Sequence, residues 1–343
     1  MAPLEAEYHD SMNTSNDKVT DSKWVKLFPQ CVADPDQSSN FMTRALYLVF
    51  STILQRRRIL GAECFSKNYI TENLKCMGLS FNNAKGLEIS QLLRHAGSAI
   101  KLGYLKEIAL VITENEDEDD ALEVYAFRVH YFKNGGVAVQ LNTTISSEQP
   151  SPFERLTELE YTGTASVKDN IIMLVRSSIF LCEKILHSLP ENYYANFRVS
   201  YTDSAPADYN IEGFSEASNF YALPKDVQSA TLGQLRPGHH GALVECMSQY
   251  ITDTYDAELK LKKFTEKVAD KLGYNATEQL YKSFSFDASA SYSDAARAND
   301  SLDSLSKSLA TNATVTPIGP TKSGSQNKDS TPRVAPYPKR NRK

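Results

Sequence analysis

Two adjacent runs of strand-forming residues constrain the fold of this chain more than any other feature. Residues 108–113 (IALVIT) form a continuous apolar run, which is typical of a strand covered on both faces. Residues 122–132 (LEVYAFRVHYF) alternate instead, and the large side chains on one predicted face are those of Tyr125, Phe127, Val129 and Tyr131. The acidic stretch 116–120 separates the two runs and is expected to be a solvated loop. The two runs therefore predict two strands at the centre of a hydrophobic core.

Three segments with helical periodicity surround these strands. The first has its apolar positions within 41–53 and ends at the basic run Arg56–Arg58, where cations suit the carbonyl end of a helix. The second covers 89–100. The third is predicted over 166–189, from a capping-box sequence to the residue before Pro190.

Further strands are predicted after the first two. A Gly-Gly turn signal at 134–136 leads into a strand-like run at 137–144. After the third helix, residues 196–201 alternate, with Phe197, Val199 and Tyr201 on one face and Asn196, Arg198 and Ser200 on the other. The order of helices and strands predicts an α+β domain, with three helices packed on a mainly antiparallel sheet.

The remainder of the chain has weaker patterns. Residues 202–246 contain three prolines and loosely spaced aromatic residues without a sustained period, which is unusual inside a compact domain. A weak helical pattern follows at 250–284. Residues 287–331 have almost no large apolar side chain and are expected to be disordered, as are residues 1–22.

Charge separates the body from the C-terminal end. The whole chain carries −5, whereas residues 322–343 have seven basic residues and one acidic residue, so that the rest carries −11. An acidic body makes direct binding of DNA across its surface an unlikely function, because phosphate contacts need clustered Lys and Arg. The sequence has no apolar run long enough for a transmembrane helix, so no membrane association is expected.

Motifs of catalysis are missing from the sequence. Phosphate-binding glycine loops, zinc-protease helices and nucleophile elbows are all absent. The five cysteines are scattered, and the adjacent His239 and His240 have no suitably spaced third ligand. The sequence thus predicts a protein that is not an enzyme, without a metal ion or cofactor.

The body, residues 24–247, resembles the HORMA domain. The resemblance is carried by the helix at 41–59, the helix at 89–104 running directly into the strand at 106–113, the strand 122–132, the long helix 166–189 and the run FRVSYTD at 197–203. The long tail with a basic end resembles the meiotic chromosome-axis branch of that family, the Hop, Him and Htp type. The HORMA domain would then span 23–247, followed by a weakly helical extension (248–286), a disordered linker (287–327) and a basic tail (328–343).

The resemblance implies binding of closure-motif peptides by strand addition. The peptide would pair with the strand Asn196, Phe197, Arg198, Val199, Ser200 and Tyr201. A safety belt over about 202–246 would wrap the peptide and return to the strand that carries Tyr125, Phe127, Val129 and Tyr131. Its large side chains are those of Tyr209, Phe214, Phe220, Tyr221, Leu223, Leu232 and Leu235.

The basic end, Thr331–Arg342, reads as the chain's own closure motif. Its proposed contact residues are Arg333, Val334, Pro336, Tyr337, Pro338, Lys339 and Arg340, which would allow self-association; a nuclear-localisation signal is the alternative interpretation. Thr316 and Thr331 precede prolines and are candidate phosphorylation sites.

The implied function is a scaffold of the meiotic chromosome axis in the nucleus, supporting homologue pairing, synapsis and crossover control. Its implied partners are other HORMA axis proteins in a cohesin context and an AAA+ ATPase that reopens the belt. Two alternatives remain open: a HORMA adaptor in checkpoint signalling, and a chromatin protein whose basic tail binds DNA directly.

Overall fold

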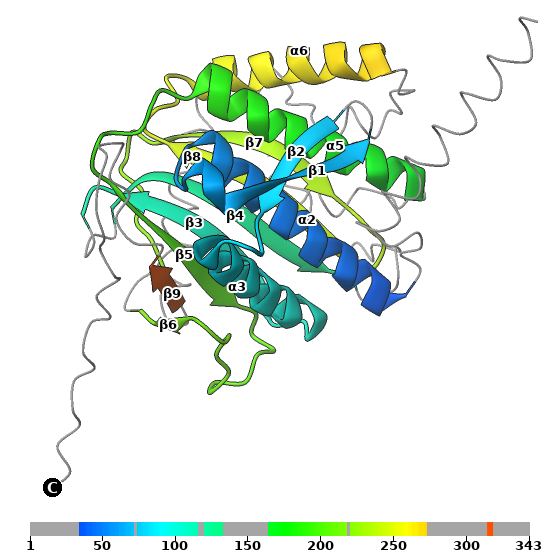
Figure 1. The fold of residues 1–343 in the computed structure, drawn as a ribbon, viewed down its shortest axis with the longest axis vertical. Helices are drawn as coiled ribbons and strands as arrows, with labels where there is room; N and C mark the ends of the chain where they lie inside the picture. The colour runs from blue at the N-terminus through cyan, green and yellow to red at the C-terminus, as the bar shows by residue number, and fades with distance from the viewer. Residues whose placement is uncertain are drawn as a thin grey trace, which may run out of the picture.

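The computed structural model describes residues 34–71, 74–115, 120–132, 164–217, 220–272 and 314–317 (Figure 1). The helices of this part are α2 (Pro35–Arg56), α3 (Ala84–Lys101), α5 (Thr164–Phe180) and α6 (Thr254–Leu272). A hairpin of β1 (Phe65–Thr71) and β2 (Leu74–Leu79) stands apart from the main sheet. The main sheet contains β3 (Leu105–Thr113), β4 (Ala121–Tyr131), β5 (Tyr194–Tyr201), β6 (Ser215–Glu216), β7 (Gln228–Leu235), β8 (His240–Ser248) and β9 (Thr314–Pro317).

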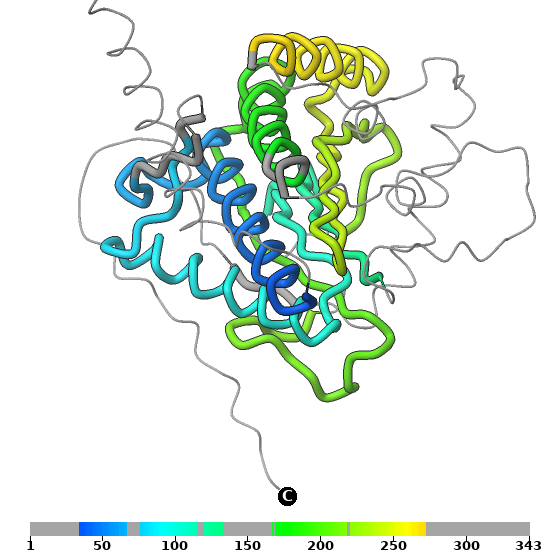
Figure 2. The backbone as a smooth tube through the Cα atoms, turned by 90° about the vertical axis from the view of Figure 1, so that its right-hand side faces the viewer, coloured from blue at the N-terminus to red at the C-terminus, as the bar shows by residue number. Residues whose placement is uncertain are grey.

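The seven strands of the main sheet run in the order β6, β9, β5, β3, β4, β8, β7, and each neighbouring pair is antiparallel. Helices α2, α3 and α5 lie on one side of this sheet (Figure 2). The predicted α+β class, with three helices on a mainly antiparallel sheet, is confirmed. The helix α6 is a fourth, which packs at the α5 and β7 end of the molecule.

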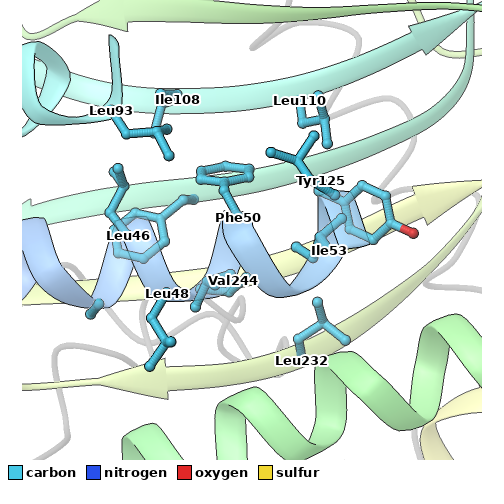
Figure 3. Close-up of a cluster of buried hydrophobic side chains, with 14 of the residues drawn as sticks. Leu46, Leu48, Phe50, Ile53, Leu93, Ile108, Leu110, Tyr125, Leu232 and Val244 are labelled. Atoms are coloured by element: carbon cyan, nitrogen blue, oxygen red, sulfur yellow. The ribbon is translucent and has the colours of Figure 1, made fainter. Parts of the chain in front are cut away.

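Helix α2 is the centre of the core. Asp34 caps it by accepting a hydrogen bond of 2.7 Å from the backbone N–H of Gln37, and Pro35 occupies the first turn, where no N–H partner is needed. The Phe50 ring meets the Phe197 ring edge-on, with the ring centroids 5.0 Å apart. Figure 3 shows side chains of α2 between those of α3 and the strands. The residues of α2 are Leu46, Phe50 and Ile53, and those around them are Leu93 of α3, Ile108 and Leu110 of β3, Tyr125 of β4 and Val244 of β8.

The central strands β3 and β4 are buried on both faces. Leu110 pairs with Tyr125 and Ile108 with Phe127, and these side chains join the core beneath the helices. Residues between them, such as Val111 and Val124, belong to a second cluster on the opposite face of the sheet, which includes Phe220 and Tyr221. The predicted pair of strands, with the aromatic face of β4 toward the core, is confirmed.

The third helix differs from its predicted length. It begins at Thr164, two residues before the predicted capping box, and its α-helical part ends at Phe180. One π-helical turn, Leu181–Ile185, follows it, and Leu186 already has an extended backbone. Apolar periodicity continues past this change, which is why the sequence pattern extends to residue 189.

The stretch 202–246 contains regular structure that the sequence pattern missed. It includes β6, β7 and most of β8, and seven residue pairs join β7 to β8 in antiparallel register. The prediction of an element-poor segment was wrong here. Small and polar residues in β7 (QSATLGQL) hide its alternation, and a register shift between Thr231 and Gly233 breaks its period.

None of the helices in the described ranges has the length and apolar content that crossing a bilayer requires. Those ranges also bring no three His, Cys, Asp or Glu side chains together as a metal site. The predicted strand at 137–144 and the closure motif at 331–342 lie outside the described residues.

Candidate peptide-binding site

Both edges of β5 are paired, one of them with a distant part of the chain. Its inner edge pairs with β3 from Tyr194 to Tyr201. Its outer edge pairs with β9, where Phe197 is the Cα partner of Thr316 and Arg198 that of Val315. The disordered linker expected over 287–327 therefore contains a strand, and Thr316 lies in it.

The strand β9 is enclosed on its other edge by β6. Ser215 is the partner of Val315 and Glu216 that of Thr314, so the backbone of the tail is paired on both sides. Because β5 and β6 both run antiparallel to β9, the 13 residues between them must cross over β9 before the chain re-enters the sheet. A segment held in this way cannot leave sideways unless β6 moves.

Every described side chain of β5 from Ala195 onward is buried. Phe197, Val199 and Tyr201 face the core under the helices. Asn196, Arg198 and Ser200, which alternate with them, are also buried. Arg198 donates from Nη1 to the backbone oxygen of Phe220 at 2.7 Å, which ties β5 to the segment that crosses the sheet after β6.

The chain leaving β5 is anchored at Tyr201. The Tyr201 hydroxyl donates to Asn210 Oδ1 at 3.2 Å and accepts from the backbone N–H of Ile211 at 3.1 Å. The Tyr209 ring packs edge-on against Tyr104 and Tyr201, with centroids 4.9 and 5.5 Å away. Phe214 is buried just before β6. These contacts fix where β6 begins.

The segment after β6 crosses the face of the sheet opposite the helices. Phe220 and Tyr221 are buried there, with the partly buried Leu223 beside them. The backbone oxygen of Ala222 accepts a hydrogen bond of 2.9 Å from the N–H of Ala121, at the start of β4. The crossing is thus fastened to the sheet by side chains and by backbone.

A buried charge network lies under this crossing. The Tyr221 hydroxyl donates to Glu107 Oε1 at 2.9 Å, and Arg128 donates from Nε to Glu107 Oε2 at 3.1 Å. Arg128 also forms an ion pair with Glu245 of β8. Burial, together with the negative charge of Glu107, raises the pKa of Tyr221 well above its usual value, so this hydroxyl keeps its proton and donates.

After the crossing, the chain returns along β4. The strand β8 pairs with β4 from Glu123–Ser248 to Tyr131–His240. The HORMA resemblance implies that β4 is the strand that receives the belt. Its contact with β8 is made through the backbone edge of the strand. The side chains on the aromatic face point into the core instead: Tyr125, Phe127, Val129 and Tyr131. Leu232 and Leu235 of β7 are fully buried.

The end of β8 is held by a buried ion pair. Glu123 accepts from Nε and Nη2 of Arg57 at 2.8 and 2.9 Å and from Ser248 Oγ at 3.0 Å; the two charged side chains are 0% and 4% exposed. Arg57 also donates to the backbone oxygen of His187 at 2.9 Å. The basic run was predicted to suit the end of the helix, and in addition Arg57 joins α2 to β4 and to the segment after the third helix.

Sequence reasoning did not assign the charged residues of these networks. Their signal is the presence of Glu107, Glu123 and Arg128 within or beside otherwise apolar strands. Buried charges are rarely retained without partners, so such residues indicate cross-strand pairs. Their partners in 221–248 could not be identified, because that region showed no strand pattern.

The chain is similar to solved structures of known proteins. C. elegans HTP-2 bound to the HIM-3 closure motif has a TM-score of 0.63 and 51% identity, over 67% of this chain and 97% of that chain. C. elegans HTP-1 bound to HTP-3 motif-1 has a TM-score of 0.63 and 53% identity, with the same coverage.

Curated relatives are more distant. HORMA domain-containing protein 1 of Rattus norvegicus is 26% identical over 60% of this chain and 50% of the relative, and that of Danio rerio is 23% identical over 63% and 58%. The matched part is thus about half the length of these relatives. A model of the HORMA domain matches residues 38–240, well over half of the chain. This protein therefore belongs to the HORMA domain family.

Proposed function

We propose that this protein is a non-enzymatic scaffold of the meiotic chromosome axis that binds closure-motif peptides at the outer edge of β5. The single observation that carries the proposal is the position of β9, a short peptide-like segment held between β5 and β6. The similarity to HTP-1 and HTP-2, each solved with a closure motif, supports this assignment.

Binding follows from strand addition. Backbone hydrogen bonds to β5 supply affinity for any extended peptide, each contributing about 0.5–1.5 kcal/mol, and side-chain fit supplies specificity. The belt, residues 202–246, encloses the peptide through β6 and closes through β8 on β4. Dissociation then requires the belt to open, so affinity resides mainly in a slow off-rate.

We infer from the pairing of β9 with β5 and β6 that the protein closes on its own tail. Forty-one residues separate the end of α6 from β9, so the tail segment and β5 belong to one chain. The tail is therefore at high effective concentration for β5 and competes with peptides of partner proteins. Thr314–Pro317 is one candidate self-closure segment, and Arg333–Arg340 is the second.

The wider role follows the family. Closure on partner axis proteins would recruit this chain to meiotic chromosomes in the nucleus, and its own tail would recruit further HORMA proteins. Homologue pairing, synapsis and crossover control are the processes that such an assembly would serve. An AAA+ ATPase would reopen the belt, and cohesin would provide the chromosomal context.

The test compares two labelled tail peptides, 308–322 and 328–343, by fluorescence anisotropy. The receptor is the full-length chain with Val315→Pro, because proline removes a backbone donor from a strand paired on both edges and frees β5. The 308–322 peptide is expected to bind and to dissociate slowly. Its Val315→Pro version is expected not to bind. Slow release of 328–343 alone would move the self-closure segment to the basic end. Failure of both peptides to bind would refute peptide capture by this chain.

A further inference from the structure

Helix α6 lies beyond residue 240, where the family match ends, and makes specific contacts with the outermost strand of the sheet. The backbone N–H of Ser229 donates to Thr254 Oγ1 at 3.1 Å, and that of Thr231 donates to Glu258 Oε1 at 2.8 Å. Both N–H groups belong to β7, whose other edge pairs with β8. Side chains of α6 therefore occupy the hydrogen-bonding positions that a further strand would take.

At the start of α6, the Thr254 hydroxyl is both donor and acceptor in hydrogen bonds with β7. Thr254 Oγ1 donates to Oε1 of Gln228 at 2.9 Å while it accepts from Ser229. Ala257 and Leu261, one and two turns further along, are buried in the main core. The first half of α6 is thereby positioned along β7.

The second half of α6 is attached to a different part of the body. The Phe264 ring stacks on Phe180 at the end of α5, with centroids 4.3 Å apart and the ring planes 13° from parallel. Val268 and Ala269 pack against Met173 of α5 in a separate small cluster. Helix α6 thus bridges α5, which lies outside residues 202–246, to β7, which lies inside them.

We propose that α6 is a latch that holds the strand pair β7–β8 against β4. The proposal rests on the proposed function for its consequence: with α6 attached to α5, the belt cannot move away from β4 without breaking the contacts of Thr254 and Glu258 with β7. Release of α6 is the first step of belt opening. Any partner that displaces α6 from Phe180 accelerates exchange of the bound peptide.

The latch is tested first without any peptide. Hydrogen–deuterium exchange is measured on the full-length chain, on the double variant Glu258→Ala/Phe264→Ala, and on Lys267→Ala, an exposed position of the same helix. Exchange in β7 and β8 is expected to become at least tenfold faster in the double variant, which corresponds to about 1.4 kcal/mol. Exchange in β3 and in the Lys267→Ala control should not change.

Two exchange results would overturn the proposal. Unchanged protection of β7 and β8 would mean that α6 does not hold them. An equal increase in β3 would mean that α6 is only part of one cooperative fold.

Peptide release then tests the consequence. The labelled 308–322 peptide, bound to the Val315→Pro chain, is expected to dissociate at least tenfold faster once Glu258→Ala and Phe264→Ala are added. An unchanged rate, with faster exchange in β7 and β8, would overturn the role of α6 in opening. If no peptide binds while the latch is intact, the proposed function fails, and the exchange comparison still decides whether α6 is a latch.

Discussion

Removal of one hydroxyl, by Tyr221→Phe, tests whether the buried charge network fastens the belt crossing. The Tyr221 hydroxyl donates to Glu107, a carboxylate that is 2% exposed, at 2.9 Å. Hydrogen bonds to charged groups contribute about 1.5–3 kcal/mol. Because Glu107 keeps Arg128 as a donor, it is not left unpaired, and a loss of about 2 kcal/mol of unfolding free energy is expected.

This loss should appear in the belt before it appears in the body. Urea unfolding of the full-length chain gives the total change, and hydrogen exchange of β8 reports opening of the belt alone. A loss of about 2 kcal/mol corresponds to roughly 30-fold more frequent opening if the bond exists only in the closed belt. The same factor is expected in the release rate of a bound closure peptide.

The matched control is Tyr209→Phe. Tyr209 also packs within the belt, and within the described residues its hydroxyl makes no hydrogen bond. The Phe variant keeps the ring contacts with Tyr104 and Tyr201. If Tyr221→Phe stays within about 0.5 kcal/mol of this control, the range of an ordinary surface substitution, the reasoning about the network is refuted.

Three further perturbations have expected outcomes. Arg57→Met leaves Glu123 charged and buried, so urea unfolding should show a loss of about 3–5 kcal/mol, most of it recovered on adding Glu123→Gln; no recovery would contradict the ion-pair account. Burial lowers the pKa of His240 from 6.5 to about 4. Between pH 6.5 and pH 4 the unfolded chain therefore binds a proton on His240 that the folded chain does not bind. Stability should therefore be full above pH 6.5 and fall by about 3 kcal/mol toward pH 4, a component that His240→Phe removes. Phosphorylation of Thr316, which lies in β9 as the Cα partner of Phe197, adds a charge of about −1.5 to −2 to a peptide that binds an acidic body, so a phosphorylated 308–322 peptide should bind more weakly; equal affinity in anisotropy would exclude this switch.

The structure also changes how the tail is understood. The sequence directs attention to the basic end, because Arg333, Tyr337 and Arg340 stand out from a low-complexity background. A strand forms at Thr314–Pro317, where β-branched residues suit an extended backbone but the sequence is not distinctive, while the basic end lies outside the described residues. Capture by strand addition depends on the backbone, so a closure segment need not be conspicuous in sequence.

Periodicity alone determined the helices α2 and α3, the pair β3–β4 and the aromatic face of β4, because each of these elements buries a regular stripe or face in one core. It also determined that Phe197, Val199 and Tyr201 share a side of β5. Only the tertiary structure decided where the charged residues go. Arg57 and Glu123 are buried because they compensate each other, and Arg128 likewise compensates Glu107 and Glu245. Hydroxyls from far along the chain, those of Tyr221 and Ser248, complete the hydrogen bonds of the two carboxylates Glu107 and Glu123. The pairing of β8 with β4, and of β9 with β5 and β6, was likewise settled by the open edges of the sheet, which local sequence patterns do not encode.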